Sequence, residues 1–280
     1  MQFTKMHGTG NDFVIVDARR LEADWETLAR AMCDRHFGVG SDGLILALPA
    51  ADADLRMRMF NPDGSEAEMC GNGIRCMAKF AVERGIATPK DDALLVDTLA
   101  GRLRCELFGQ DGIISRVRVS MGQPSFAPDE IPVVAESSGP LLDLPIRVEG
   151  GDFRVTCVSM GNPHAVRFTE QPVAEIDLEH IGPRVEHHPA FPRRVNFEVA
   201  NVLDRDRLRM RVWERGAGMT LACGTGACAT AVAARLHGLV DDAVDIELPG
   251  GGGHGTALGL ALEHGRVTVG EGRDLWQVRD

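Results

Sequence analysis

The chain carries one sequence pattern twice, and this internal repeat constrains its fold more than any other feature. The segment LRMRMFN at residues 55–61 is echoed by LRMRVWE at residues 208–214. Cys70 in MCGNG is matched by Cys223 in ACGTG, and a glycine closes each copy, all at an offset of 153 positions. Asn11 and Asn162, each preceding an apolar run, are 151 positions apart. Landmarks that keep almost one offset indicate a duplicated unit.

The repeat also predicts where the two halves divide. At 280 residues the chain is long enough for two domains of ordinary size. We place the boundary near VSMGQPSF, residues 119–126, and expect an N-terminal half at 1–122 and a C-terminal half at 123–265. A last strand, about residues 266–280, could return to the N-terminal half.

The local patterns predict sheets and two special helices. Alternating apolar and arginine side chains in the two echoed segments are typical of half-solvated strands. Further strands are expected at residues 13–17, 44–48, 114–121, 146–149, 153–160, 195–203 and 244–248. The segments after each Cys-Gly-x-Gly are largely apolar all round and end at a glycine, which predicts a buried helix. The expected fold class is α+β, with two pseudo-symmetric domains, each a largely antiparallel sheet wrapped around a central buried helix.

Composition excludes several classes of function. The net charge of −11 argues against nucleic-acid and anionic-membrane partners. No apolar run is long enough to cross a bilayer, and the start MQFTKMHGTGNDF has no secretory h-region. Seven cysteines, an odd number, favour reduced thiols and a cytoplasmic protein over a disulfide framework. No pair has the C-x2-C spacing of a zinc site, so we expect no metal.

Two cysteines, Cys70 and Cys223, are predicted to stand where the two buried helices begin. The partial positive charge there lowers the pKa of a thiol toward neutrality and attracts a carboxylate. If the halves pack about a pseudo-twofold axis, the two thiols can face opposite sides of one bound carbon. That geometry predicts inversion of a stereocentre, in which one thiolate removes a proton and the other thiol returns one. The remaining cysteines read as core residues: 33, 76, 105, 157 and 228.

At this point the sequence resembles a known family. The segments MHGTGNDFVIVD, FNPDGSEAEMCGNGIRC, GNPHAV, RVNFEV and WERGAGMTLACGTGACA are similar to signature sequences of the diaminopimelate epimerases, in order from residue 6 to about 250. The resemblance implies cofactor-independent epimerisation of LL- to meso-diaminopimelate, in lysine and peptidoglycan precursor biosynthesis. It also implies an amino-acid substrate and a homodimer.

The resemblance further implies roles for residues at matching positions. Cys70 and Cys223 would be catalytic, with Cys223 accepting and Cys70 donating the proton in the LL-to-meso direction. His164 and Glu214 would hold the substrate ammonium and tune the thiols, and the forked guanidinium of Arg215 would bind a carboxylate. The remaining implied substrate-binding residues are the backbone amides of Gly71, Asn72, Gly224 and Thr225 and the side chains of Asn11, Asn61, Asn162 and Asn196.

Three departures from the family pattern leave the substrate open. Met219 stands where we expect an acidic residue, Gly43 stands where some relatives carry glutamine, and the chain after Gly251 lacks an MTGPA-like segment. A racemase or epimerase of the same architecture acting on another amino acid is therefore an alternative.

Other functional classes are alternatives to an epimerase. A pyridoxal-phosphate racemase needs a Schiff-base lysine, and none of Lys5, Lys79 and Lys90 lies in a motif that suggests one. Outside catalysis, a reversible disulfide between the repeated cysteines would make a redox switch, and the same residues could serve an amino-acid-binding protein. The stretch LPGGGGHGTALG, residues 248–259, has dinucleotide-type glycine spacing, but no convincing helix follows it.

Overall fold

The chain folds into two compact units in the computed structural model. The structure describes all residues except 9, 111–112, 136–138, 250–255, 264–265 and 271–280, and describes side chains up to residue 249. Within the described residues, unit 1 is built from Met1–Ser120 together with Gly270, and unit 2 from Met121–Val269. The limits expected from the sequence, 1–122 and 123–265, stay predictions. Of the expected last strand, only Arg266–Gly270 is described, and half of the glycine-rich stretch 248–259, residues 250–255, lies outside the described residues.

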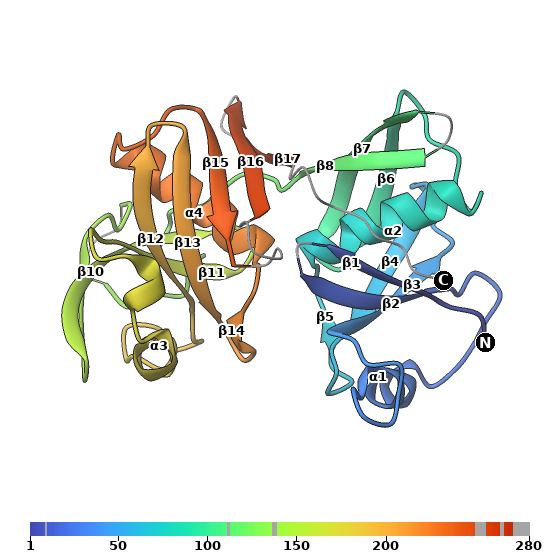
Figure 1. Ribbon diagram of the computed structural model, residues 1–280, viewed down its shortest axis with the longest axis horizontal. Coiled ribbons are helices and arrows are strands. Elements are labelled where there is room, and N and C mark those ends of the chain that lie inside the picture. The colour runs from blue at the N-terminus through green and yellow to red at the C-terminus, as the bar shows by residue number, and fades with distance from the viewer. Residues whose placement is uncertain (9, 111–112, 136–138, 250–255, 264–265, 271–280) are drawn as a thin grey trace. The chain divides into compact units, whose positions relative to one another are not determined.

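Unit 1 alternates short strands with two helices (Figure 1). Its elements are β1 (Thr4–Gly8), β2 (Asn11–Asp17), α1 (Trp25–Cys33), β3 (Gly43–Leu48), β4 (Leu55–Phe60), β5 (Glu66–Ala67), α2 (Gly71–Glu83), β6 (Ala93–Thr98), β7 (Gly101–Gln110) and β8 (Ile113–Ser120). The pairs β1–β2, β3–β4, β4–β5, β6–β7 and β7–β8 are antiparallel. The pairs β2–β3 and β4–β6 are parallel. The sheet is therefore largely antiparallel, as predicted.

Unit 2 repeats most of this pairing. Its elements are β9 (Leu144–Val148), β10 (Gly151–Ser159), β11 (Pro163–Phe168), a short 3-10 turn (Val173–Glu175), α3 (Leu178–Glu186), β12 (Asn196–Asp204), β13 (Arg207–Glu214), β14 (Gly218–Thr220), α4 (Gly224–Leu236), β15 (Ala243–Leu248), β16 (Thr256–Glu263) and β17 (Arg266–Gly270). Here β11–β12 and β13–β15 are the parallel pairs, at the positions of β2–β3 and β4–β6. The antiparallel pairs β10–β11, β12–β13, β13–β14 and β15–β16 correspond to β1–β2, β3–β4, β4–β5 and β6–β7. The antiparallel pair β9–β10 is an addition in unit 2.

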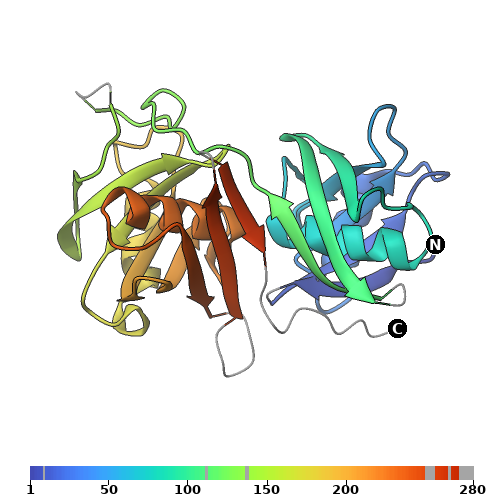
Figure 2. The ribbon, with the colours of Figure 1, turned by 90° about the horizontal axis from the view of Figure 1, so that it is seen from above.

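The helices that follow the repeated cysteines lie at the centre of their units. Helix α2 contacts strands β1–β4, β7 and β8, and α4 contacts β10–β13, β15 and β16 (Figure 2). Both helices are followed by a glycine with positive φ, Gly85 at 65° and Gly238 at 67°, which is the backbone conformation that ends a helix. The central buried helices and the α+β fold class predicted from the repeat are confirmed.

The interior of α2 differs from the apolar helix that the sequence suggested. Arg75 and Lys79 lie within the helix and are 2% and 5% exposed. Lys79 Nζ donates to the carbonyl of Ile114 at 2.6 Å and pairs with Glu83 at 2.5 Å. These partners compensate the burial of the charge, which sequence patterning could not reveal. The corresponding positions of α4 are Cys228 and Val232, both buried.

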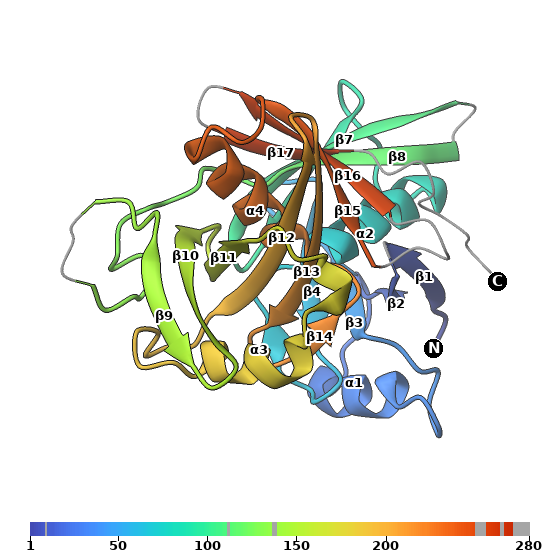
Figure 3. The same cartoon turned by 60° about the vertical axis from the view of Figure 1, so that its left-hand side comes forward.

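Two further helices, α1 and α3, were not identified from the sequence. Helix α1 packs on β3 and β4, and α3 packs on β9, β12, β13 and β14 (Figure 3). Their N-terminal caps are Asp24, which accepts from the backbone N–H of Thr27, and Asp177, which accepts from that of His180. Both are nine-residue elements, so their patterns are short. Among the described residues, no helix is long and apolar enough to span a membrane.

Candidate active site

Each repeated cysteine is the N-terminal cap of the central helix of its unit. Cys70 Sγ accepts a hydrogen bond from the backbone N–H of Gly73 at 3.4 Å, and Cys223 Sγ accepts one from that of Gly226 at 3.3 Å. Both caps have extended backbone, with φ of −138° and −124°. The sequence therefore placed both thiols correctly, where backbone N–H groups stabilise a sulfur that carries negative charge.

In unit 1, amide side chains meet at the start of α2. Asn72 Nδ2 donates to Asn11 Oδ1 at 2.6 Å, and Asn11 Nδ2 donates to Asp42 Oδ2 at 3.2 Å. Asn72 Oδ1 accepts from the buried guanidinium of Arg75. These contacts fix both amides, so Asn11 and Asn72 are held beside the cap formed by Cys70.

Two further predicted residues lie at the ends of strands. Asn61 follows β4 and donates to Ser65 Oγ at 3.0 Å. Asn196 begins β12 and is 4% exposed. Its Nδ2 donates to the carbonyl of Pro163 at 2.8 Å, and its Oδ1 accepts from the backbone N–H of Arg215 at 2.9 Å. Asn196 thus ties Arg215, the residue that follows β13, to β11.

In unit 2, four side chains form a chain of hydrogen bonds that ends at the helix cap. Glu198 Oε1 lies 2.7 Å from His164 Nδ1, and His164 Nε2 lies 2.9 Å from Asn162 Oδ1. Asn162 Nδ2 donates to Thr225 Oγ1 at 3.2 Å, and Thr225 Oγ1 lies 3.4 Å from Cys223 Sγ. The structure therefore brings together four predicted residues and one, Glu198, that the sequence analysis missed.

Electrostatics at Cys223 contradicts one expectation from the sequence. Burial raises the pKa of the Cys223 thiol well above its ordinary value of 9.0, and the nearby carboxyls of Glu214 and Glu198 raise it further. Hydrogen bonds from Thr225 and from the backbone N–H of Gly226 act in the opposite direction but do not prevail. The expected shift toward neutrality is wrong for this thiol, because the buried site removes the water that would solvate a thiolate.

Burial also disfavours the ionised forms of the two carboxyls near Cys223. Burial raises the pKa of Glu198, although His164 opposes the shift. Burial likewise raises the pKa of Glu214, whose hydrogen bonds with Thr220 and Cys223 oppose the shift. The thiol and both carboxyls therefore share a buried environment in which an added negative charge is unfavourable.

A mismatch between the two copies of the repeat marks Glu198 in the sequence. At the offset of 153 it corresponds to Ile45 in the apolar strand LILAL. A carboxylate at a position where the other copy carries isoleucine is unexpected for a buried strand.

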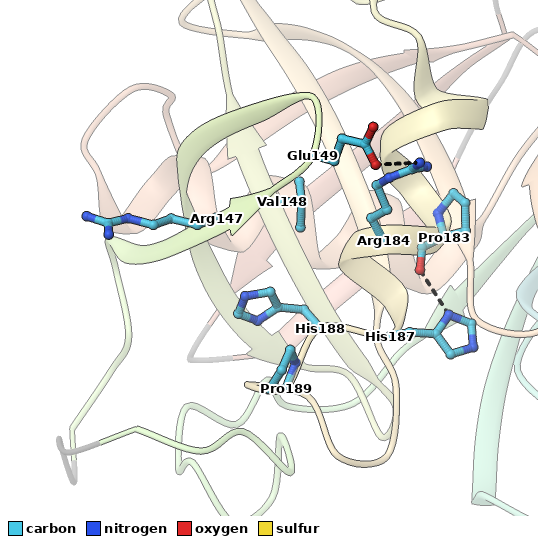
Figure 4. Close-up of a pocket in the computed structure, with 8 residues that line it drawn as sticks. All are labelled: Arg147, Val148, Glu149, Pro183, Arg184, His187, His188 and Pro189. Atoms are coloured by element: carbon cyan, nitrogen blue, oxygen red, sulfur yellow. Dashed lines mark hydrogen bonds and ion pairs between the residues drawn. The ribbon is translucent and has the colours of Figure 1, made fainter.

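A surface pocket of about 480 Å³ on unit 2 lies apart from these residues. It is lined by Arg147, Val148, Glu149, Pro183, Arg184, His187, His188 and Pro189 (Figure 4). Arg184 donates to Glu149 at 3.1 Å across the pocket, and His187 Nδ1 donates to the carbonyl of Pro183 at 2.9 Å. None of the predicted site residues lines it. In the described part of the chain, no group of three His, Cys, Asp or Glu residues is placed to hold a metal ion.

Comparison with known proteins identifies the family. The sequence pattern described as "Diaminopimelate epimerase" matches residues 3–127 and 156–256. The chain belongs to the diaminopimelate epimerase family. The diaminopimelate epimerase of Moorella thermoacetica is 54% identical over 253 residues, which cover 90% of this chain and 89% of that protein. That of Acetivibrio thermocellus is 50% identical over 252 residues, covering 90% and 89%.

A more distant solved structure shares the fold of this diaminopimelate epimerase family member. The crystal structure of a hydroxyproline epimerase from Agrobacterium vitis, with bound trans-4-OH-L-proline, matches with a TM-score of 0.70. The match covers 100% of this chain and 91% of that chain at 19% sequence identity. At that identity the likeness establishes the fold alone.

Proposed function

We propose that this chain epimerises diaminopimelate at one α-carbon, with Cys70 and Cys223 as the two proton-transfer groups. The observation that carries the proposal is that a cysteine caps each of two equivalent buried helices, in a chain of the diaminopimelate epimerase family. The substrate is a small molecule of the amino-acid class. We further propose a cytoplasmic homodimer that binds neither nucleic acid nor membrane and needs no cofactor.

The chemistry follows from what each cap offers. In the LL-to-meso direction, the Cys223 thiolate takes the α-proton and becomes a thiol, and the electron pair left on carbon delocalises into the substrate carboxylate. The Cys70 thiol then gives its proton to the opposite face and becomes a thiolate. Backbone amides of Gly71, Asn72, Gly224 and Thr225 would hold the carboxylate, where the helix ends stabilise its developing charge.

Substrate binding would also counteract the raised pKa of Cys223. Glu214 is one of the groups that raise it, and the Cys223 thiol is hydrogen-bonded to that carboxyl. A substrate ammonium beside Glu214 and His164 would offset the negative charge that disfavours the thiolate. The proton-accepting form of Cys223 would therefore be populated mainly when substrate is bound. Arg215, Asn11, Asn61, Asn162 and Asn196 would orient the substrate.

Proton exchange tests this function directly. The purified, reduced protein is incubated with LL-diaminopimelate in D2O, and the α-proton is followed by NMR. We expect loss of the α-proton signal together with formation of the meso isomer. Absence of exchange by a folded protein would contradict diaminopimelate as the substrate. Parallel incubations with other amino acids would then show whether the protein epimerises or racemises one of them.

A further inference from the structure

The two units place different side chains at the same positions beneath their central helices. A Cβ built on Gly73 of α2 would lie 2.8 Å from Ile45 Cδ1, and one built on Gly226 of α4 would lie 2.7 Å from Glu198 Oε1. His164 likewise takes the position of Phe13, each lying two residues beyond the paired asparagine of its unit. Unit 2 therefore carries a carboxyl and an imidazole, both 0% exposed, where unit 1 carries hydrocarbon.

The hydrogen bonds of this buried pair have a defined direction. Asn162 Nδ2 donates to Thr225, so Asn162 Oδ1 faces His164 and must accept from it. Nε2 of His164 therefore carries a hydrogen, and one more proton lies between Nδ1 and Glu198 Oε1. Whether that proton rests on the carboxyl or on the imidazole, the pair has zero net charge and Nε2–H still donates.

The direction extends to the sulfur. Because Thr225 Oγ1 already accepts from Asn162, its own hydroxyl hydrogen is available for Cys223 Sγ, 3.4 Å away. In unit 1 the corresponding bond runs the other way, since Asn72 donates to Asn11. The direction of the Asn162–Thr225 hydrogen bond in unit 2 thus depends on His164, which contacts Asn162 Oδ1.

We propose that Glu198 is a positioning residue for the two-cysteine reaction: through His164, Asn162 and Thr225 it orients a hydrogen bond toward the Cys223 sulfur that favours the thiolate. The proposal rests on the proposed function for its catalytic meaning, although the orientation itself is independent of it. Without a partner at Nδ1, His164 can carry its hydrogen there, and Asn162 then turns its amide to donate to Nε2. Thr225 would donate to Asn162 in that arrangement and leave the sulfur.

The same geometry allows a second effect of opposite sign. The titratable groups that act on Cys223 are Glu214 on β13 and Glu198 on β12, and His164 on β11 faces Glu198. If Glu198 acted chiefly as a negative charge, removing it would make the thiolate easier to form. If it acts by orienting the hydrogen bonds that run through His164, Asn162 and Thr225, here called the relay, removing it makes the thiolate harder to form. The two effects are separable because glutamine keeps the hydrogen bond and loses the charge.

Alkylation of Cys223 by iodoacetamide measures this thiolate without requiring substrate. The rate is followed from pH 7 to 10 by mass spectrometry of the Cys223 peptide, in a Cys70→Ser background. We expect Glu198→Ile to slow alkylation at pH 8 by about tenfold, the value of one hydrogen bond to a charged group. Glu198→Gln, whose amide can donate to Nδ1, should stay within about twofold of the parent. In a His164→Phe background, Glu198→Ile should add little further change, because the relay is already interrupted.

Matched controls separate the relay from folding. Ile45→Val alters the equivalent buried position of unit 1 and should leave Cys223 alkylation unchanged, and near-UV circular dichroism reports the fold of each variant. Faster alkylation in Glu198→Ile, or equal effects of isoleucine and glutamine, would overturn the proposal. In active enzyme, Glu198→Ile should lower kcat more than it raises KM. Absence of α-proton exchange by the parent protein would instead count against the proposed function and leave the alkylation result standing.

Discussion

Units 1 and 2 share a backbone pairing scheme but differ in what lies beneath the helix that each cysteine caps. Phe13 and Ile45 in unit 1 are replaced by His164 and Glu198 in unit 2. All four side chains are at most 1% exposed, so the shared fold buries the apolar pair and the polar pair equally. The difference shows that duplication fixes where a thiol is held, whereas the side chains that break the repeat decide how that thiol titrates.

The buried polar pair of unit 2, His164 and Glu198, is tolerated because its side chains are hydrogen-bonded. Glu198 Oε1 has His164 as its partner, and His164 has Asn162 on its other nitrogen. Glu198 Oε2, in contrast, has no hydrogen-bond partner among the described residues. A neutral carboxyl bears such an orphaned oxygen at less cost than a carboxylate, in agreement with the raised pKa of Glu198.

The largest expected effect comes from removing either thiol. Cys70→Ala and Cys223→Ala should each lower epimerisation by about 10³-fold or more, because each removes a proton-transfer group that the other unit cannot replace. The measurement is the rate of meso-diaminopimelate formation, with circular dichroism to establish folding. Cys105→Ala, at a buried cysteine on β7, is the matched control and should stay active. Full activity in either cap variant would contradict the two-thiol mechanism.

Exchanging one member of either buried pair should lower the free energy of unfolding. Ile45→Glu places a carboxyl beside Phe13, which offers no hydrogen bond, and should lower the free energy of unfolding by about 3 kcal/mol or more. Glu198→Ile should cost about 1–3 kcal/mol, because it leaves His164 Nδ1 unpaired. The double variant His164→Phe, Glu198→Ile removes both partners and should recover most of that loss.

Urea unfolding of the four proteins measures these differences. The double variant is the critical sample, since unit 1 already holds phenylalanine and isoleucine at these positions. If it were less stable than Glu198→Ile alone, the equivalence of the two buried sites would be wrong.

The smallest expected effect concerns a surface pair at another break in the repeat. Arg58 holds Glu66 through two hydrogen bonds at 2.7 and 2.8 Å, and this pairing lowers the pKa of the Glu66 carboxyl. At the equivalent positions, Arg211 Nη2 lies 3.0 Å from Met219 Sδ. Met219→Glu should form the missing ion pair and raise the free energy of unfolding by about 0.5 kcal/mol at pH 7.

The pH dependence of that gain has a fixed sign. A carboxyl whose pKa is lowered in the folded state contributes its full stabilisation above the ordinary value of 4.5 and loses it as the pH falls through the folded pKa. Urea unfolding at pH 7 and pH 3 should therefore show the gain only at the higher pH. Met219→Gln, of similar length and without charge, is the control and should gain nothing at either pH.

Much of the fold could be predicted because it depends on short-range patterns. Alternation of apolar and charged residues identified β4 and β13, and the cysteine–glycine segments identified the start of α2 and α4. Helices α1 and α3 were missed because nine residues carry too few turns to show a clear period. The buried charges of α2 were missed because their partners come from elsewhere in the fold, as Ile114 does for Lys79.

The sequence by itself determined the duplication, the family and the two cysteines at helix starts, because each of these is written in the order and spacing of residues along the chain. Only the tertiary structure decided the electrostatics of Cys223. Its raised pKa comes from burial and from Glu198 and Glu214, which lie 25 and 9 positions earlier in the chain. Helix-end polarity is a local property, but desolvation depends on everything packed around the thiol, and here desolvation is the larger effect.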